Sequence, residues 1–267
     1  MLGNSTELIF LAVVYLIFFA VEHIAPHFKN RKQHLQHSAR NLLLAGINYI
    51  IAFGIFILLL SQVFAWTENN NFGLLNQLNL NWFASYLLAF VLIDLWQYIW
   101  HRLNHQLVFL WRFHQVHHAD KEMDASTGVR FHPIEIILSS MARVAIIPLL
   151  GIQAGQLLMY ELVLLPIILF HHSNVRLNET VDRILRQVIV TPHMHRLHHS
   201  DIKSETNSNY ASIFSFWDKV FNSYTMRSIE TGFRLGLGKQ FSPIEWNTFK
   251  GFMKIPFQKL PPYIPPE

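Results

Sequence analysis

The sequence WFASYLLAFVLIDLWQYIW at residues 82–100 runs directly into HRLNHQLVFLWRFHQVHH at residues 101–118. The first segment is mostly apolar and has the length of a membrane-spanning helix, about 20 residues. The second segment contains five histidines, and the first of them, His101, follows the apolar run at once. This junction predicts a membrane helix that delivers histidines to the membrane surface.

The composition indicates that lipid forms part of the surroundings. Apolar types make up 51% of the 267 residues and charged types 14%, against about 25% charged residues in ordinary soluble domains. The net charge is only +4, and the basic residues flank apolar segments, so we expect no nucleic-acid partner. The sequence contains no cysteine, which excludes disulfides, thiolate metal sites and cysteine nucleophiles.

Three other apolar stretches complete the predicted membrane region. Residues 8–20 reach spanning length only with their flanks, whereas residues 41–66 are long enough to span with tilt. Residues 134–170 are interrupted by glycines near the middle, so we expect two helices in a spanning or re-entrant hairpin. Arg143 and Glu161 lie inside this hairpin, where charges should face protein or a polar cavity.

The distribution of basic residues predicts the orientation. The loop at residues 67–81 has no Lys or Arg, whereas the loop at residues 29–40 contains Lys29, Arg31, Lys32 and Arg40. By the positive-inside rule, the basic loop and the histidines from His101 onward face the cytoplasm. We expect a multi-pass protein, in a bacterial plasma membrane in preference to the endoplasmic reticulum, because the sequence ends without an ER-retrieval signal.

Histidine is the unusual residue type, because twelve of the 16 histidines fall between residues 101 and 199. They form the boxes HRLNH at 101–105, HQVHH at 114–118 and HRLHH at 195–199. Residues three and four positions apart share one face of a helix, so each box can present its imidazoles to a common metal. The candidate ligands are His101, His105, His114, His117, His118, His195, His198 and His199.

The remaining histidines receive different assignments. His172, where the hairpin returns to the side of the boxes, is a further candidate ligand, and we favour it over His171. His132 is expected to be either a metal ligand or a residue that contacts a ligand. A role at the surface or the membrane interface is expected for His23, His27, His34 and His37. His193 is expected to be a capping or surface residue.

Asp94 and Tyr98 precede His101 on nearly the same helical face. Asp94 could accept the second ring N–H of a ligand histidine and so fix its tautomer. Eight or more imidazoles exceed the roughly four ligands of one zinc ion, which predicts two metals. Imidazole suits zinc, copper, iron and nickel alike, so the ligands leave the metal open. The boxes contain neither the Glu-x-x-His pair of soluble di-iron proteins nor the HExxH motif of metalloproteases.

The boxes resemble those of the fatty acid hydroxylase/sterol desaturase superfamily, whose membrane enzymes carry HxxxH, HxxHH and HxxHH. The resemblance runs from about Asp94 to Tyr224, roughly half of the chain. Further matching segments are Asp94 with Tyr98, Arg130-Phe-His-Pro-Ile-Glu135, His172-Ser-Asn174, Thr191-Pro192, Asn209-Tyr210 and Phe216-Trp217-Asp218. Two departures bear on the subfamily: Ala211 replaces a frequent Gly, and Phe221-Asn222-Ser223 replaces a frequent Phe-Gly-Thr.

The resemblance implies O₂ activation at a centre of two iron ions, with Asp94, Tyr98 and Asn209 behind the ligand histidines. The reaction would hydroxylate or desaturate a membrane lipid, such as a fatty acyl group, a sterol or hopanoid, a carotenoid or an alkylglycerol ether. The chain shows no flavin, haem or Fe–S fingerprint, so we expect an external electron donor: a reductase, or a carrier of the ferredoxin or cytochrome b5 type.

We expect an all-α integral membrane protein with about four transmembrane or hairpin helices, and with Pro133 and Pro192 at helix starts. A cytoplasmic, histidine-rich helical cap from residues 101–132 and 171–224 would hold the two metals. The predicted parts are transmembrane helices at 1–100, a catalytic domain at 101–224 that includes the hairpin near 134–170, and a tail at 225–267 ending in LPPYIPP.

Other classes of protein remain open at this point. A metal carrier would prefer acidic and histidine residues within its spanning helices, whereas these boxes lie just outside the apolar runs. A haem protein would place single axial histidines on facing helices. Residue chemistry alone excludes neither a zinc-dependent lipid hydrolase nor a non-catalytic relative.

Overall fold

The computed structural model of the protein describes residues 5–29, 33–229, 232–238 and 247–258. Over these ranges the chain is helical, with isolated bridges in place of strands, which confirms the predicted all-α class. Two basic-loop residues, Arg31 and Lys32, and the LPPYIPP tail lie outside the described residues.

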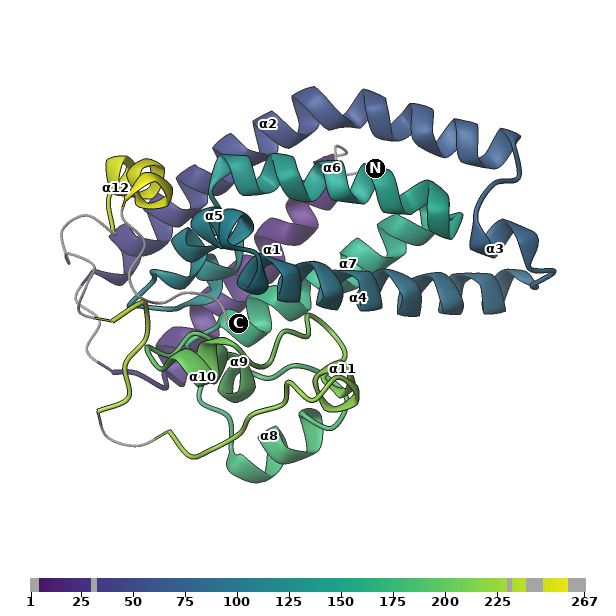
Figure 1. Ribbon diagram of the computed structural model, residues 1–267. Helices are drawn as coiled ribbons and strands as arrows, with labels where there is room; N and C mark the ends of the chain where they lie inside the picture. The colour runs from purple at the N-terminus through teal and green to yellow at the C-terminus, as the bar shows by residue number, and fades with distance from the viewer. Residues whose placement is uncertain (1–4, 30–32, 230–231, 239–246, 259–267) are drawn as a thin grey trace.

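Long helices make up the apolar part of the molecule (Figure 1). They are α1 (Ser5–Ile24), α2 (His34–Asn69), α4 (Trp82–Gln106), α6 (Pro133–Leu150) and α7 (Ala154–His172). Four segments are long and apolar enough to cross a membrane: His34–Gln77, which includes the short α3 (Leu74–Gln77), and the three helices α4, α6 and α7. The predicted stretch at residues 8–20 lies in a shorter apolar helix, Ile9–Ile24.

Short helices carry the second and third histidine boxes and the segments around them. α8, α9, α10 and α11 gather on one side of the long helices (Figure 1). The short elements are α5 (Val108–His118), η1 (Ala125–Val129), α8 (Glu179–Leu185), α9 (Pro192–His198), α10 (Lys203–Thr206), α11 (Phe216–Val220), α12 (Phe249–Lys254) and η2 (Ile255–Phe257).

The outer faces of the long helices suit a lipid environment. Only 11% of the apolar window of α6 and 22% of that of α4 are buried inside the protein. Large apolar side chains such as Ile50 and Leu58, each 71% exposed, project outward. A soluble protein would not expose so much contiguous apolar surface, whereas helices satisfy their own backbone hydrogen bonds within lipid.

The hairpin breaks where the sequence predicted, at Gly151, which ends α6 with a left-handed φ of 73°. Gly73, in the turn before α3, packs against this break. A Cβ on Gly73 would lie 2.2 Å from the Pro148 carbonyl oxygen, so the two chain segments approach too closely for any side chain. This contact fixes the end of α2 beside the hairpin, and α2 packs along α6.

The two predicted helix starts are confirmed. Pro133 and Pro192 occupy the first turns of α6 and α9, where a missing N–H leaves no gap in the hydrogen-bond pattern. The side chain of Thr191 caps α9 by accepting from the Met194 N–H. These caps fix where the helices that carry or support the boxes begin.

A buried polar network joins α2 to the loop that follows the second histidine box. Both ring nitrogens of His37 donate to carboxylates: Nδ1 lies 2.7 Å from Asp124 Oδ2, and Nε2 lies 2.9 Å from Asp120 Oδ1. Burial alone would raise the pKa of the Asp120 carboxyl, but His37 and Arg130 hold it well below its usual range. The network anchors the loop directly behind the second box.

The predicted surface position of His37 is therefore wrong, whereas His34 is half-buried. His37 is fully buried, and His34 Nε2 lies 3.1 Å from Asp124 and 3.4 Å from Glu22 of α1. Both histidines pair with carboxylates. The two carboxylates that His37 contacts lie more than 80 residues away in the sequence, so no local sequence pattern reveals these pairs. His23, by contrast, is exposed as predicted.

We expect His37→Ala to lower the free energy of unfolding by about 3–5 kcal/mol, because it leaves two buried carboxylates without their shared partner. The thermal midpoint of the purified protein in detergent measures the loss. Gln36→Ala, an exposed position on the same helix turn, serves as the control and should change stability by less than about 0.5 kcal/mol. Equal midpoints for the two variants would contradict the role of the network.

Candidate metal centre

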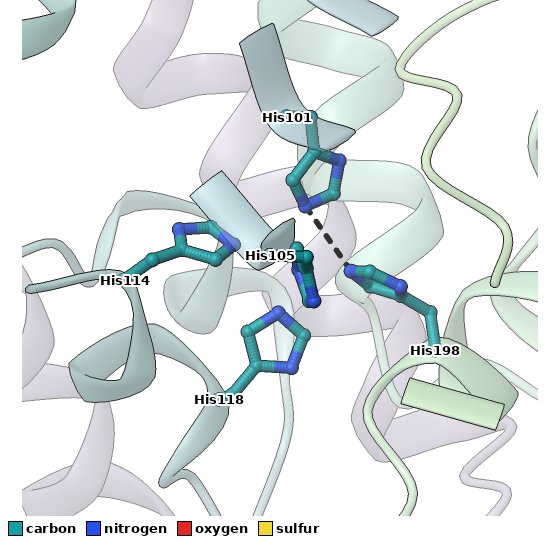
Figure 2. Close-up of side chains that lie close together, drawn as sticks. All are labelled: His101, His105, His114, His118 and His198. Atoms are coloured by element: carbon teal, nitrogen blue, oxygen red, sulfur yellow. Dashed lines mark hydrogen bonds between the residues drawn. The ribbon is translucent and has the colours of Figure 1, made fainter. Parts of the chain in front are cut away.

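Nine histidines come together in two adjacent groups. The five-histidine group consists of His101, His105, His114, His118 and His198, and the four-histidine group of His117, His172, His195 and His199. Within each group, one ring nitrogen of every member lies within 4.8 Å of those of all the others. Figure 2 shows the rings of the five-histidine group directed at one shared point. Each group has the composition of a site for one metal ion.

Each HxxHH box divides its histidines between the two groups. His117 is the one member of the second box that joins the four-histidine group, and His198 is the one member of the third box that joins the five-histidine group. The groups meet where the rings of His118 and His199 stack, with centroids 4.3 Å apart. Two metals bound here would therefore be neighbours, held by shared helices.

Backbone carbonyls on either side of Asn209 orient two of the rings. The Nδ1–H of His198 donates to the Ser208 carbonyl at 2.6 Å, and that of His101 donates to the Tyr210 carbonyl at 2.7 Å. Asn209 has a left-handed φ of 55°, which asparagine tolerates better than most residues. Its side-chain amide donates two further hydrogen bonds to backbone carbonyls. Asn209 thus shapes the loop that leaves Nε2 of both histidines free to face the group.

Glu135 orients a third ring. The Nδ1–H of His114 donates to Glu135 Oε1 at 2.6 Å, so His114 presents Nε2 to the five-histidine group. A carboxylate behind a ligand histidine fixes its tautomer and raises its basicity. The sequence motif Arg130-Phe-His-Pro-Ile-Glu135 contains this residue, but sequence reasoning did not single it out. Its place in the first turn of α6, after Pro133, was the available signal.

The unpaired ring nitrogens fit bound metal ions. Among the described residues, both ring nitrogens of His105, His118 and His199 are buried without a hydrogen-bond partner. The Nε2 atoms of His101 and His198 approach each other to 3.1 Å. Buried polar atoms without partners are costly, and a cation between converging nitrogens would satisfy them. An all-imidazole donor set suits a first-row transition metal.

Burial keeps five imidazoles of the second and third boxes neutral. Desolvation, reinforced by neighbouring histidines, lowers the pKa of His117, His118, His195 and His199 well below the usual value. Desolvation also lowers the pKa of His198, to about 3. A neutral imidazole retains the lone pair that a metal ion needs. These five rings are thus in the ligand form over the ordinary pH range.

His132 and His171 lie outside both groups. His132 caps α6, because its Nδ1 accepts from the Ile134 N–H at 3.1 Å, so the structure assigns the residue to helix capping and not to the ligand set. The buried ring of His171 packs against that of His195, with centroids 4.1 Å apart. His193 is half-buried, with Nε2 2.9 Å from the Arg227 carbonyl oxygen.

Asp94 does not make the expected contact with a ligand histidine. Its carboxylate accepts from the Tyr160 hydroxyl, the Trp217 indole N–H and the Phe214 backbone N–H. Seven residues along a helix correspond to about 10 Å, which places Asp94 too far from His101. The carboxylate instead ties α4 to α7 and α11.

Tyr98 also acts away from the rings. Its hydroxyl lies 2.7 Å from Ser223 Oγ and accepts from Arg102 at 3.2 Å. The Tyr98 ring lies 6.3 Å from that of Tyr210, whose carbonyl orients His101. Tyr98 therefore supports the loop that carries this carbonyl.

A cavity of about 370 Å³ adjoins the histidines. Six histidines line it: His101, His114, His117, His171, His172 and His195. Apolar residues of α2, α6 and α7 also line it: Ala45, Ala52, Ile136, Leu164, Leu165 and Ile168. The cavity has the character of a site for an apolar molecule held against the two histidine groups.

A family model for fatty acid hydroxylases matches residues 86–223, just over half of the chain. Ornithine lipid hydroxylase of Rhizobium tropici is 31% identical over 137 residues, 51% of this chain and 40% of that protein. Human alkylglycerol monooxygenase is 27% identical over 173 residues, 62% of this chain and 35% of that protein. Human cholesterol 25-hydroxylase is 26% identical over 145 residues, 54% of this chain and 52% of that protein.

The chain thus spans about half or less of the length of these relatives. No solved structure matches it. The region that the family model covers contains all three histidine boxes and Glu135. This chain belongs to the fatty acid hydroxylase family.

Proposed function

We propose that the protein is a membrane-bound oxygenase that hydroxylates a lipid at a centre of two iron ions, using O₂ and electrons from an external donor. One observation carries this proposal: two adjacent histidine groups line an apolar cavity between helices that can cross a membrane. A lipid chain could enter from the bilayer and reach the metals without crossing water.

The five-histidine group would hold one iron and the four-histidine group the other. When bound, the iron pair supplies the O₂ chemistry and electron transfer that oxidation of an unreactive C–H bond requires. The chain itself performs the remaining tasks. Glu135 and the Ser208 and Tyr210 carbonyls hold the rings in the ligand tautomer, and the apolar cavity walls position the substrate carbon and exclude water.

Hydroxylation is favoured over desaturation because the relatives above are named hydroxylases and monooxygenases of lipids. In hydroxylation one oxygen atom of O₂ enters the C–H bond. The other leaves as water, with two electrons and two protons that an external donor must supply. A reductase, or a carrier of the ferredoxin or cytochrome b5 type, would dock on the histidine side, which the positive-inside pattern assigns to the cytoplasm.

Isotope labelling tests this proposal against a metal-dependent hydrolase. We expect lipid extracts of cells that produce the protein under ¹⁸O₂ to contain a lipid with one added ¹⁸O atom. After growth under ordinary O₂ in H₂¹⁸O, the added oxygen atom of this lipid should carry no label, and cells producing His117→Ala should not form the lipid. A hydrolase would give the reverse, with product oxygen taken from water.

Metal content should follow the division into two groups. We expect His117→Ala to reduce the iron of the four-histidine group, and His198→Ala that of the five-histidine group, so that each variant binds half of the wild-type iron or less. Both should lose lipid oxidation. Elemental analysis of the purified variants gives the result, with the exposed His23→Ala as control. Full metal content and turnover in either ligand variant would count against the assignment.

Loss of Glu135 should weaken metal binding without removing a ligand. We expect Glu135→Ala to lower metal affinity about 10–100-fold, because His114 loses the carboxylate that fixes its tautomer. Competition with a chelator measures the change. Glu68→Ala, an exposed acidic residue at the far end of α2, should retain wild-type affinity. Equal affinities for the two variants would mean that Glu135 serves only the fold.

A further inference from the structure

The cavity beside the histidines also contains an arginine deep within the membrane hairpin. Arg143 of α6 lines it, together with Ser139 and Gln97. The Nη1 atom of Arg143 donates to Glu161 Oε1 of α7 at 2.5 Å. The side chain of Glu161 is 9% exposed and that of Arg143 is 31% exposed. The prediction that these two charges face protein or a polar cavity is therefore confirmed.

The ion pair leaves most of the guanidinium unsatisfied. Arginine carries five N–H donors, and within the described part of the chain one hydrogen bond leaves Arg143. Ser139, one helical turn closer to the histidines, accepts from the Trp100 indole N–H at 2.9 Å and keeps its own hydroxyl proton available to donate. Arg143 and Ser139 both line the cavity, and donors at membrane depth require acceptors.

The position of Arg143 along α6 sets a distance. Glu135, which holds His114, and Arg143 both line the cavity. Eight residues of helix separate them, which corresponds to about 12 Å at ~1.5 Å per residue. The cavity therefore extends along α6 from the histidine groups to a cluster of hydrogen-bond donors.

We infer that Arg143 determines substrate specificity, an inference that rests on the oxygenase function proposed above. The substrate would be a lipid with an uncharged oxygen acceptor, such as a hydroxyl, ether or ester carbonyl, about 12 Å from the carbon that faces the histidines. A pure hydrocarbon would leave the Arg143 donors unpaired. An anionic group would meet the Glu161 carboxylate, which already neutralises Arg143.

Binding, measured without turnover, tests this inference. Trp100 lines the cavity, so a bromine-labelled lipid bound there quenches its fluorescence. In nanodiscs we expect the wild type to bind a bromine-labelled long-chain alcohol at least about tenfold more tightly than the bromoalkane of the same length, at equal mole fraction in the bilayer. Trp100→Phe identifies the part of the signal that comes from the cavity.

In the double variant R143M/E161Q, which leaves no unpaired charge, the alcohol and the bromoalkane should bind equally. Met141→Leu, on the outward face of α6 and 56% exposed, should keep the wild-type preference. Equal binding of the two probes by the wild type, or a preference that survives in R143M/E161Q, would overturn the inference and leave the ion pair as a structural link between α6 and α7.

A single variant provides a second test if the double variant does not fold. In Glu161→Gln, the charge of Arg143 is no longer neutralised. A bromine-labelled fatty acid anion should therefore bind to this variant at least about tenfold more tightly than to the wild type. Unchanged binding would overturn the inference. Metal content and ¹⁸O incorporation, measured in parallel, reveal a failure of the oxygenase proposal separately, because the binding measurements require neither.

Discussion

The lone pairs of nine imidazoles, eight of them buried, point at two neighbouring sites, and the rest of the structure depends on this convergence. Buried nitrogens without partners would destabilise a protein that has nothing to place between them. The histidines come from α4, α5, α7 and the α9 segment, so the helices must be held in register before any metal can be shared. Metal binding and the packing of these helices are therefore coupled.

The structure supports the convergence from several directions. Asn209 shapes the loop whose carbonyls orient His101 and His198, and Glu135 orients His114. Behind the second box, His37 bridges Asp120 and Asp124 and so connects α2 to the loop. These residues lie outside the two histidine groups. They restrict the rings to geometries in which a metal can be bound, as the hydrogen-bond partners of metal ligands do in other metal sites.

Much of the fold and of the site follows from periodicity that is visible in the sequence. Apolar runs of spanning length predict the long helices, and spacings of three and four residues predict which histidines share a face. The division of each HxxHH box between two groups does not follow in this way, because His117 turns to its group only through contacts with α7 and α9. The roles of His37 and Asp94 could not be predicted for the same reason, because their hydrogen-bond partners lie on other elements. His132 differs from its predicted role because its ring caps α6.

We expect each of the two histidine groups to hold one iron ion. The most direct measurement is the Mössbauer spectrum and metal content of full-length protein, purified in detergent after growth on ⁵⁷Fe. We expect two irons per chain, each in an environment rich in nitrogen ligands, with spectra that change on reduction and on exposure to O₂. Tightly bound zinc that iron cannot replace, or a single metal per chain, would show that the two groups do not form a di-iron centre.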